Sequence, residues 1–422
     1  MDALDVYLNG APMGKLRRVG KGVRFSYTAE VAAGHMGEPL LSTALPVRED
    51  EYDAAATRNW FRGLLPENAR LLEICRVLRL DPADWFAVLA EIGWECAGAV
   101  SVFPEGQSFL GREEGFRKVS KEELADRLRA LPRLPLDDRD SLRVSLGGYQ
   151  EKICLTLGDA VMKDGYAEIG TVLLPERGAV STHILKPQPA EFSGMIEGEA
   201  WAMMAARCVT LCAETALLRL ESAPETLVVR RFDRCGSDGR FERIHQEDCC
   251  QAMGNSPDDK YATDAGKPKK SDPSFKRIVE ILRRYAVDPD LQVQRLFRQM
   301  LVNCVLGNTD AHAKNYALLH DDAEGVTLAP MYDVVPACEI TPLVKAIGMR
   351  IGGAIRFDRV DRDRVEAEAK SWGMPSRVIG ALMGDTCDAL LQGIEEADRC
   401  YPQAAARHST AARERVKQLM KG

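Results

Sequence analysis

The stretch 308–315, "NTDAHAKN", places two asparagines, an aspartate, a histidine and a lysine among eight residues. It overlaps the end of segment 291–308, "LQVQRLFRQMLVNCVLGN", whose apolar residues recur at three- and four-residue steps and predict a buried helix. Gly307 suits the end of that helix, because glycine readily adopts the left-handed conformation found there. Beyond the stretch, "YALLH" and "VTLAP" predict a short hairpin. So many polar groups at the end of a buried helix indicate a loop that faces a cleft.

The spacing of three oxygen-bearing side chains points to one kind of chemistry. Asp310 lies five residues before Asn315, and Asp333 lies eighteen residues after Asn315, beyond the predicted hairpin. Protein kinases space a catalytic aspartate and two metal-binding residues similarly, because phosphoryl transfer needs a carboxylate near the attacking hydroxyl and hard oxygen ligands for Mg²⁺. The alternative is a capped turn, since Asn, Thr and Asp all favour turns. The spacing alone leaves both interpretations open.

Two upstream segments could bind the phosphates of a nucleotide. "SLGGYQEK", residues 145–152, contains Gly147 and Gly148, which let the backbone approach an anion closely, although a plain hairpin turn would have the same pattern. Lys186 ends the predicted strand "THILK" and could neutralise phosphates, or it could be a solvated strand end. Glu199, on the helix that follows, could pair with Lys186 or remain a surface carboxylate.

The pattern of apolar residues divides the chain into three parts. Residues 1–105 predict short strands and helices, and residues 106–232 predict more strands with one amphipathic helix at 198–218. Residues 233–422 predict mainly helices, interrupted by a polar loop at 254–274. A strand-rich lobe followed by a mainly helical lobe indicates an α+β, bilobal architecture with the polar cluster in the second lobe.

Composition restricts the class of protein further. Of the 422 residues, 45 % are hydrophobic and 28 % are charged, which is ordinary for a globular protein. The net charge of −7 argues against a broad basic surface for nucleic acid. The twelve cysteines form no Cys-x-x-Cys pair, which favours reduced thiols over disulfides or zinc ligands. Neither a signal peptide nor a membrane-spanning segment is recognisable, so we expect a cytoplasmic protein.

Six segments, in order, resemble the HipA family of serine/threonine kinases, which are toxins of bacterial toxin–antitoxin systems. They are "SLGGYQEK", "THILKP", "VVRRFDR", "HQEDCCQAMG", "NTDAHAKN" and "LAPMYDVVPA". The segment "NWFRGLLPEN" is similar to that family's N-terminal domain, so the resemblance covers nearly the whole chain. It implies a bilobal, protein-kinase-like fold, with a HipA-type N-terminal α/β subdomain at 1–105, the remainder of the N-lobe at 106–232 and the C-lobe at 233–422.

The resemblance also implies roles for individual residues. Asp310 matches the catalytic aspartate, and Asn315 and Asp333 match the Mg²⁺ ligands. Ser145 matches a serine that family members autophosphorylate, which would disable the nucleotide site because the added charge repels ATP phosphates. The matches to nucleotide-binding residues are Gly147, Gly148, Gln150 and Lys152 in the phosphate loop, Lys186, and Arg231 and Phe232 at the hinge between lobes.

Some residues near these motifs have other interpretations. Arg230 stands where the family's pattern leads us to expect an acidic residue, and Tyr149 is bulky for its position in the phosphate loop. His312 could take part in catalysis, but we expect it to fix the loop by hydrogen bonding. Asp233 is expected to hold Arg234 or the start of a helix rather than to do chemistry.

The function implied by the resemblance is transfer of the ATP γ-phosphate, with Mg²⁺, to a serine of a target protein. The family's targets are typically translation proteins such as aminoacyl-tRNA synthetases. A small HipB-like antitoxin is the implied partner, and the chain would reach DNA only through it. Two other functions remain open at this point. The chain could be a catalytically silent corepressor that binds the antitoxin, or an adenylyltransferase on the same scaffold.

Overall fold

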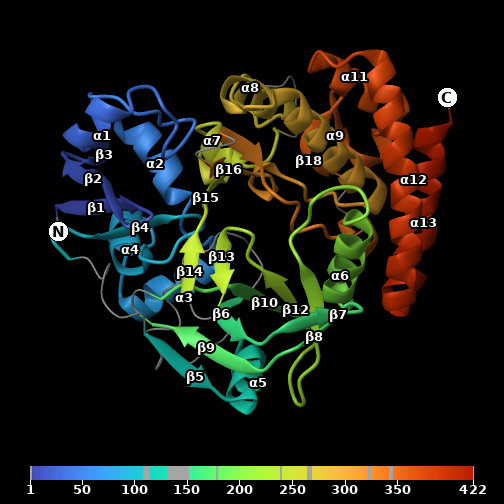
Figure 1. Cartoon of the computed structure of the whole chain (residues 1–422), viewed down its shortest axis with the longest axis horizontal. Helices are drawn as coiled ribbons and strands as arrows, with labels where there is room; N and C mark the ends of the chain where they lie inside the picture. Colours follow the sequence, from blue (N-terminus) through green and yellow to red (C-terminus); the bar gives the residue numbers. More distant parts are fainter. Residues whose placement is uncertain are drawn as a thin grey trace.

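The computed structural model forms three groups of elements, which Figure 1 shows as a blue N-terminal unit, a mostly green strand-rich lobe and a yellow-to-red helical lobe. Predicted residues Ser145, Gly147, Gly148 and Gln150 lie outside the described part of the chain, as does Tyr149. Within the part described, no helix is long and apolar enough to cross a membrane. The structure describes residues 2–107, 115–131, 152–176, 179–237, 240–263, 269–321, 325–341 and 346–421.

The N-terminal unit is a four-stranded antiparallel sheet, ordered β3-β2-β1-β4, with helices packed against it. Its core contains Phe25, Trp60 and Phe61. The ring centroid of Phe61 lies 5.2 Å from that of Phe25 and 4.8 Å from that of Trp60. The elements are β1 Ala3–Leu8, β2 Ala11–Val19, β3 Gly22–Tyr27, α1 Ala29–Gly34, α2 Ala54–Arg62, α3 Asn68–Leu78, α4 Trp85–Ile92 and β4 Val100–Pro104.

The strand-rich lobe contains an eight-stranded sheet in the order β5-β9-β6-β10-β12-β11-β8-β7. This order places β10, which carries Lys186, in the sheet interior between β6 and β12. The elements are β5 Phe116–Val119, α5 Lys121–Ala130, β6 Ile153–Gly158, β7 Val161–Lys163, β8 Tyr166–Glu168, β9 Thr171–Pro175, β10 His183–Pro187, α6 Met195–Ala206, β11 Thr215–Leu218 and β12 Thr226–Arg230.

The predicted helix at 198–218 is wrong in extent and in character. Helix α6 ends at Ala206, and the last part of the expected helix forms β11. Every residue of α6 from Ile196 onward is buried, so the helix is enclosed on all sides and is not amphipathic. It packs in the same core as the helical lobe. The domain limits at 105 and 232 therefore stay a prediction, since packing crosses the second of them.

The helical lobe is built around α9, whose C-cap Gly307 has φ of 76°, as the sequence predicts. The expected hairpin is also present as β16 and β17, which extend β15 into a three-stranded sheet. The elements are β13 Arg234–Ser237, β14 Arg240–Arg243, β15 His245–Asp248, α7 Cys249–Ala252, η1 Pro257–Asp259, α8 Phe275–Tyr285, α9 Pro289–Leu306, η2 Ala313–Asn315, β16 Ala317–Asp321, β17 Gly325–Leu328, α10 Ala337–Ile340, β18 Ala346–Ile351, β19 Ala354–Arg356, η3 Phe357–Arg359, α11 Arg362–Ser371, α12 Ser376–Cys400 and α13 Pro402–Met420.

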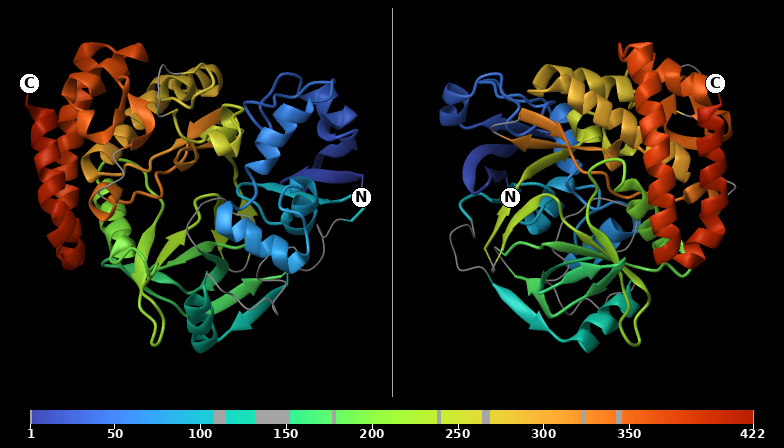
Figure 2. Two further views of the ribbon diagram at one scale, coloured as in Figure 1. Left: turned by 180° about the vertical axis from the view of Figure 1, so that it is seen from behind. Right: turned by 45° about the vertical axis from the view of Figure 1, so that its right-hand side comes forward.

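The expectation of a mainly helical chain after residue 233 overlooked several short strands. Strands β13 and β14 form one hairpin and β18 and β19 another. Strand β15 pairs with β16 about seventy residues later, so local periodicity could not reveal it. The long helices α12 and α13 lie side by side along one flank of the molecule (Figure 2). All twelve cysteine thiols are free, and seven of them are buried.

A buried ionic cluster joins the N-terminal unit to the strand-rich lobe. Glu95, which is fully buried, accepts hydrogen bonds from Arg231 at 3.1 Å and from Arg234 at 3.3 Å, and Arg243 lies 2.5 Å from its other oxygen. Asp233 binds the guanidinium of Arg231 through both carboxylate oxygens, at 2.9 and 2.8 Å. Asp233 also lies 3.0 Å from Arg234, as the sequence predicts. Each charge in the cluster has an opposite partner, so loss of any one member would leave an uncompensated buried charge at this junction.

A second carboxylate, Glu247 of β15, joins the N-terminal unit to the helical lobe. It accepts hydrogen bonds from the hydroxyl of Ser42 at 2.5 Å, the backbone N–H of Thr43 at 2.8 Å and the indole of Trp60 at 3.0 Å. His320 of the neighbouring strand lies 3.2 Å away. Glu247 is buried, and these donors replace the water that its carboxylate would otherwise bind.

We predict that Glu95→Gln strongly destabilises the protein, because the buried Arg231 and Arg234 and the partly buried Arg243 lose part of their compensating charge. The free energy of unfolding should fall by ~3–5 kcal/mol, the usual effect of breaking a buried ion pair. Denaturant unfolding followed by circular dichroism measures this change. Glu105→Gln is the control, since the Glu105 side chain is 57 % exposed and its ion pair with Lys15 lies at the surface. We expect it to cost less than ~1 kcal/mol, and equal losses in the two variants would contradict the prediction.

Candidate active site

The side chain of Lys186 on β10 contacts two carboxylates, one on the next helix and one 147 residues later in the chain. Its Nζ donates to Oε1 of Glu199 on α6 at 2.7 Å and to Oδ1 of Asp333 beyond β17 at 2.6 Å. Lys186 is 8 % exposed and Glu199 is 1 % exposed. The predicted pair of Lys186 and Glu199 is therefore present, and neither residue is the solvated surface group of the alternative interpretation.

The charges of these groups depend on one another. Burial alone would raise the pKa of Asp333, but the positive charge and hydrogen bond of Lys186 hold this pKa at about 2. Burial would lower the pKa of Lys186, yet the two carboxylates raise it above its ordinary value. Asp333 is thus an anion and Lys186 a cation at neutral pH. Burial raises the pKa of Glu199, while Lys186 acts in the opposite direction.

The backbone at Asp333 adopts an unusual conformation. Its φ is 59°, in the left-handed region that costs a residue other than glycine ~1–2 kcal/mol. Asn308 holds this segment, because its Nδ2 donates to the carbonyl of Asp333 at 3.2 Å and to Oδ1 of Asn303 at 2.9 Å. The Asn308 side chain thereby attaches the loop 308–315 to the segment that contains Asp333.

The stretch 308–315 is a hydrogen-bonded turn, and most of its residues are buried. The backbone N–H of Asp310 donates to Oδ1 of Asn308 at 3.2 Å, and Nδ2 of Asn315 donates to the carbonyl of Asp310 at 3.2 Å. Gly348 of β18 packs so closely that a Cβ there would lie 2.5 Å from the backbone of Ala311. These contacts fix the loop, while Asp310 itself stays exposed to solvent.

Two aromatic residues lie beside the Asp310 carboxylate. The hydroxyl of Tyr261 donates to Oδ1 of Asp310 at 2.7 Å. The ring of Tyr261 meets the ring of His312 edge to face, with centroids 4.9 Å apart. Burial, followed by the positive charge of Lys260, lowers the pKa of His312 to about 3, so the imidazole is neutral at physiological pH. Sequence reasoning missed Tyr261, because it lies in a polar segment with no recognisable pattern.

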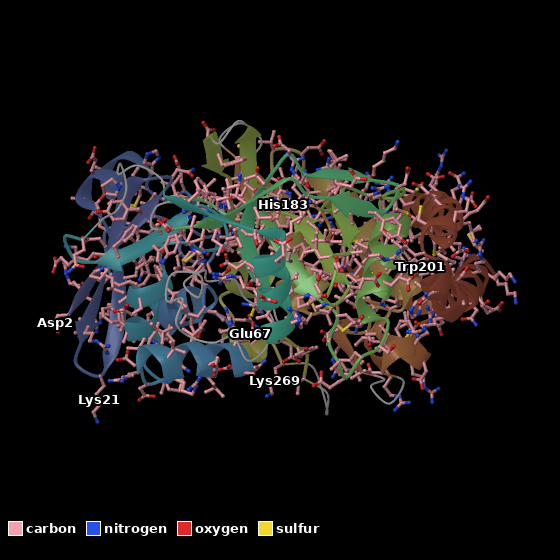
Figure 3. All side chains as sticks on the ribbon, turned by 90° about the horizontal axis from the view of Figure 1, so that it is seen from below. Asp2, Lys21, Glu67, His183, Trp201 and Lys269 are labelled. Atoms are coloured by element: carbon pink, nitrogen blue, oxygen red, sulfur yellow. The ribbon has the colours of Figure 1, made fainter. Side chains whose placement is uncertain are left out.

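The N-terminal unit also contacts the polar loop, through Glu67. Its carboxylate lies 2.6 Å from Lys260 and 3.4 Å from Lys314 of the loop, and Lys314 also lies 3.0 Å from Asp248. In Figure 3 Glu67 lies near the centre of the molecule, whereas Asp2 and Lys21 of the same unit lie at its outer end. Glu67 belongs to the quoted segment "NWFRGLLPEN", but its spacing gave no indication of this role.

The residues expected to bind nucleotide occupy different surroundings. Lys152 precedes β6 and is near enough to Lys186 and Asp333 for their charges to influence its pKa, which burial lowers. The side chain of Arg231 belongs to the Glu95 cluster, and its backbone N–H donates to the carbonyl of Thr182 at 2.9 Å. The ring of Phe232 packs 5.5 Å from that of Tyr332. Adenine binding at Arg231 and Phe232 stays a prediction, and the N–H of Arg231 is already engaged.

The donor set suits a magnesium ion bound together with phosphates. Asn315 uses its amide nitrogen on the carbonyl of Asp310, so the amide oxygen is the ligand atom that it can offer. Asp333 adds a carboxylate. The described residues contain no group of three His, Cys, Asp or Glu side chains able to enclose a metal. Two oxygen ligands plus phosphate and water oxygens are the usual way in which proteins hold Mg²⁺.

The chain has a strand-rich lobe and a helical lobe, and Lys186 of the first lobe binds Asp333 of the second. This arrangement is that of a bilobal α+β protein of the kinase-like class. A solved HipA, from a complex of Shewanella oneidensis HipA and HipB with operator DNA, has this fold. The two chains superimpose with a TM-score of 0.83 over 99 % of this chain and 97 % of the other, at 23 % sequence identity.

The sequence places the chain in a family within that class. Residues 4–103 match the HipA N-terminal domain, and residues 144–394 match the HipA-like C-terminal domain. The chain is 33 % identical to a Sinorhizobium fredii protein named "Putative kinase Y4mE", over 95 % of this chain and 94 % of that protein. It is 26 % identical to the serine/threonine-protein kinase toxin HipA of Shewanella oneidensis, over 93 % and 88 %. The chain belongs to the HipA family.

We predict that Lys186→Met destabilises the protein, because Glu199 would remain buried without its cation. The loss should be ~3 kcal/mol in the free energy of unfolding, and Lys186→Met/Glu199→Gln should recover part of it. Denaturant unfolding measures both variants. Lys163→Met, an exposed lysine on β7 of the same sheet, is the control. A loss in Lys186→Met no larger than in this control would mean that the buried pair contributes nothing.

Proposed function

We propose that this chain is the toxin of a toxin–antitoxin system and acts as a protein serine/threonine kinase. It transfers the γ-phosphate of ATP to a serine of a target protein. The observation that carries the proposal is the contact of Lys186 with both Glu199 and Asp333, beside a loop that exposes Asp310. A buried lysine between lobes, a carboxylate beyond a hairpin and an exposed aspartate are the parts that phosphoryl transfer requires.

The proposed reaction assigns one task to each group. Lys186 and Lys152 neutralise phosphate oxygens, and Asn315 and Asp333 hold Mg²⁺, which balances the charge of the β- and γ-phosphates. Asp310 orients the serine hydroxyl and accepts its proton. The hydroxyl oxygen forms a bond to the γ-phosphorus as the bond to the bridging oxygen breaks, and ADP leaves with that electron pair. Phosphoserine and ADP are the products.

The remaining assignments are proposed from the family resemblance. Gly147, Gly148 and Gln150 contact the ATP phosphates, and Arg231 and Phe232 lie along the adenine site. Phosphorylation of Ser145 switches the enzyme off by adding negative charge where ATP phosphates bind. The target is a translation protein, such as an aminoacyl-tRNA synthetase.

The proposed partner is a HipB-like antitoxin. The solved Shewanella oneidensis relative is in a complex with HipB and its operator DNA, and this chain has the same fold. Its net charge of −7 gives no general attraction to DNA, so contact with an operator would be made through the antitoxin.

We predict that Asp310→Ala and Asp333→Ala each lower phosphate transfer at least ~100-fold, the usual effect of removing a group that acts on the proton or on transition-state charge. Purified chain is incubated with Mg²⁺ and ATP labelled at the γ-phosphate, and label on protein is counted. Growth of cells that express each variant reports toxicity, which both substitutions should abolish.

The controls separate this function from its competitors. Asp363→Ala, an exposed carboxylate on α11, should transfer phosphate like the unaltered chain. Asp310→Ala should still bind Mg²⁺–ADP, because Asp310 is not assigned to the phosphates. Label from the α-phosphate in place of the γ-phosphate would identify an adenylyltransferase. Unaltered activity of Asp310→Ala would overturn the kinase assignment.

A further inference from the structure

The hydroxyl of Tyr261 makes a direct contact with the proposed catalytic carboxylate. It donates to Oδ1 of Asp310 at 2.7 Å, although Tyr261 is 45 % exposed and its hydroxyl could bind water instead. A hydrogen bond to a charged acceptor is stronger than one between neutral groups. The two residues are 49 positions apart, so the contact does not follow from a local turn.

The backbone around Tyr261 is attached to the catalytic loop and to β18. The carbonyl of Lys260 accepts from the N–H of Ala313 at 3.1 Å, and the N–H of Ala262 donates to the carbonyl of Gly348 at 2.9 Å. Gly348 in turn donates to the carbonyl of Thr309 at 3.0 Å. Tyr261 is therefore held on both sides by segments that also hold Asp310.

Side-chain contacts of Tyr261 and of its neighbour Lys260 strengthen this attachment. The ring of Tyr261 lies edge to face with His312, at an interplanar angle of 86°. The ammonium of Lys260 binds Glu67 of the N-terminal unit at 2.6 Å. Backbone hydrogen bonds, the ring contact and the anchored Lys260 hold Tyr261 in one place. This fixed geometry suits a residue that positions its neighbour rather than one that moves during the reaction.

We propose that Tyr261 is a positioning residue that orients the Asp310 carboxylate for phosphate transfer. This inference rests on the proposed kinase function. By binding Oδ1, the phenol hydroxyl limits rotation of the carboxylate and presents Oδ2 to the serine hydroxyl. The proton of that serine passes to Oδ2 as its oxygen bonds to the γ-phosphorus, while the proton of Tyr261 stays on the phenol. A carboxylate already oriented for the reaction removes part of the entropic barrier to transfer.

The test is Tyr261→Phe, which removes only the hydroxyl and keeps the ring beside His312. The matched control is Tyr7→Phe, which removes a phenol hydroxyl from β1 in the N-terminal unit. For each full-length variant, transfer of label from γ-labelled ATP onto the chain is measured over a range of ATP concentrations. Binding of Mg²⁺–ADP is measured by calorimetry.

We expect Tyr261→Phe to lower kcat about tenfold, the effect of losing one hydrogen bond to a charged group. The KM for ATP and the affinity for Mg²⁺–ADP should stay within about twofold of the unaltered chain, because nucleotide binding does not involve Tyr261. General damage to the fold would instead lower both kcat and the affinity for nucleotide. Tyr7→Phe should match the unaltered chain throughout.

An unchanged kcat in Tyr261→Phe would overturn the inference while leaving the kinase function intact. So would a higher kcat, since it would mean that the hydroxyl competes with the serine for Asp310. Loss of nucleotide affinity in parallel with kcat would also overturn it, because Tyr261 would then only support the fold. If the unaltered chain transfers no phosphate at all, the proposed function fails and this inference fails with it.

Discussion

The arrangement of this protein depends on one cation between two carboxylates. Lys186 comes from the interior of the eight-stranded sheet, Glu199 from the enclosed helix α6, and Asp333 from the segment beyond the β16–β17 hairpin. Glu199 is too deeply buried to keep a charge without a partner, so the sheet, the helix and the hairpin must keep their relative positions. The same contact keeps Asp333 ionised beside the loop that carries Asp310. In the proposed function, the contact that stabilises the fold also holds the cation and the anion that a magnesium–nucleotide pair would need in fixed positions.

The N-terminal unit is joined to the rest of the molecule by buried charged and polar contacts, whereas the strand-rich and helical lobes share an apolar core through α6. Three separate apolar cores occupy the N-terminal unit, the strand-rich lobe and the helical lobe with α6. Glu95, Glu247 and Glu67 each reach across a boundary between groups to arginines, hydroxyls or lysines. Apolar surfaces tolerate sliding, but hydrogen bonds to a carboxylate have defined directions. The carboxylates therefore determine how the groups are oriented, and Glu67 extends this orientation to the lysine next to Tyr261.

The sequence predicted those parts of the site whose signals are local. Helix α9 and its glycine cap, the hairpin after the polar loop and the strand that ends near Lys186 all follow from periodicity and spacing. For Glu199 the sequence left two interpretations open, and the structure shows the pair with Lys186. Contacts between distant segments left no such signal. Tyr261 reaches Asp310 from a polar segment without periodicity, and the Arg231 side chain is buried against Glu95, 136 residues earlier in the chain. The extent of α6 was misjudged because an enclosed helix and the strand after it are both continuously apolar.

The contacts of Glu247 have a consequence for how such proteins evolve by recombination. Its carboxylate accepts from two hydroxyls and one backbone N–H of the loop before α2 and from the indole N–H of Trp60 in α2 itself, 187 to 205 residues earlier in the chain. An N-terminal segment exchanged with a distant relative would have to bring all of these donors to the same point. Otherwise a buried acceptor loses its partners, at about 1–3 kcal/mol for each unsatisfied group. An exchange of the N-terminal segment that does not keep these donors is therefore expected to destabilise the protein.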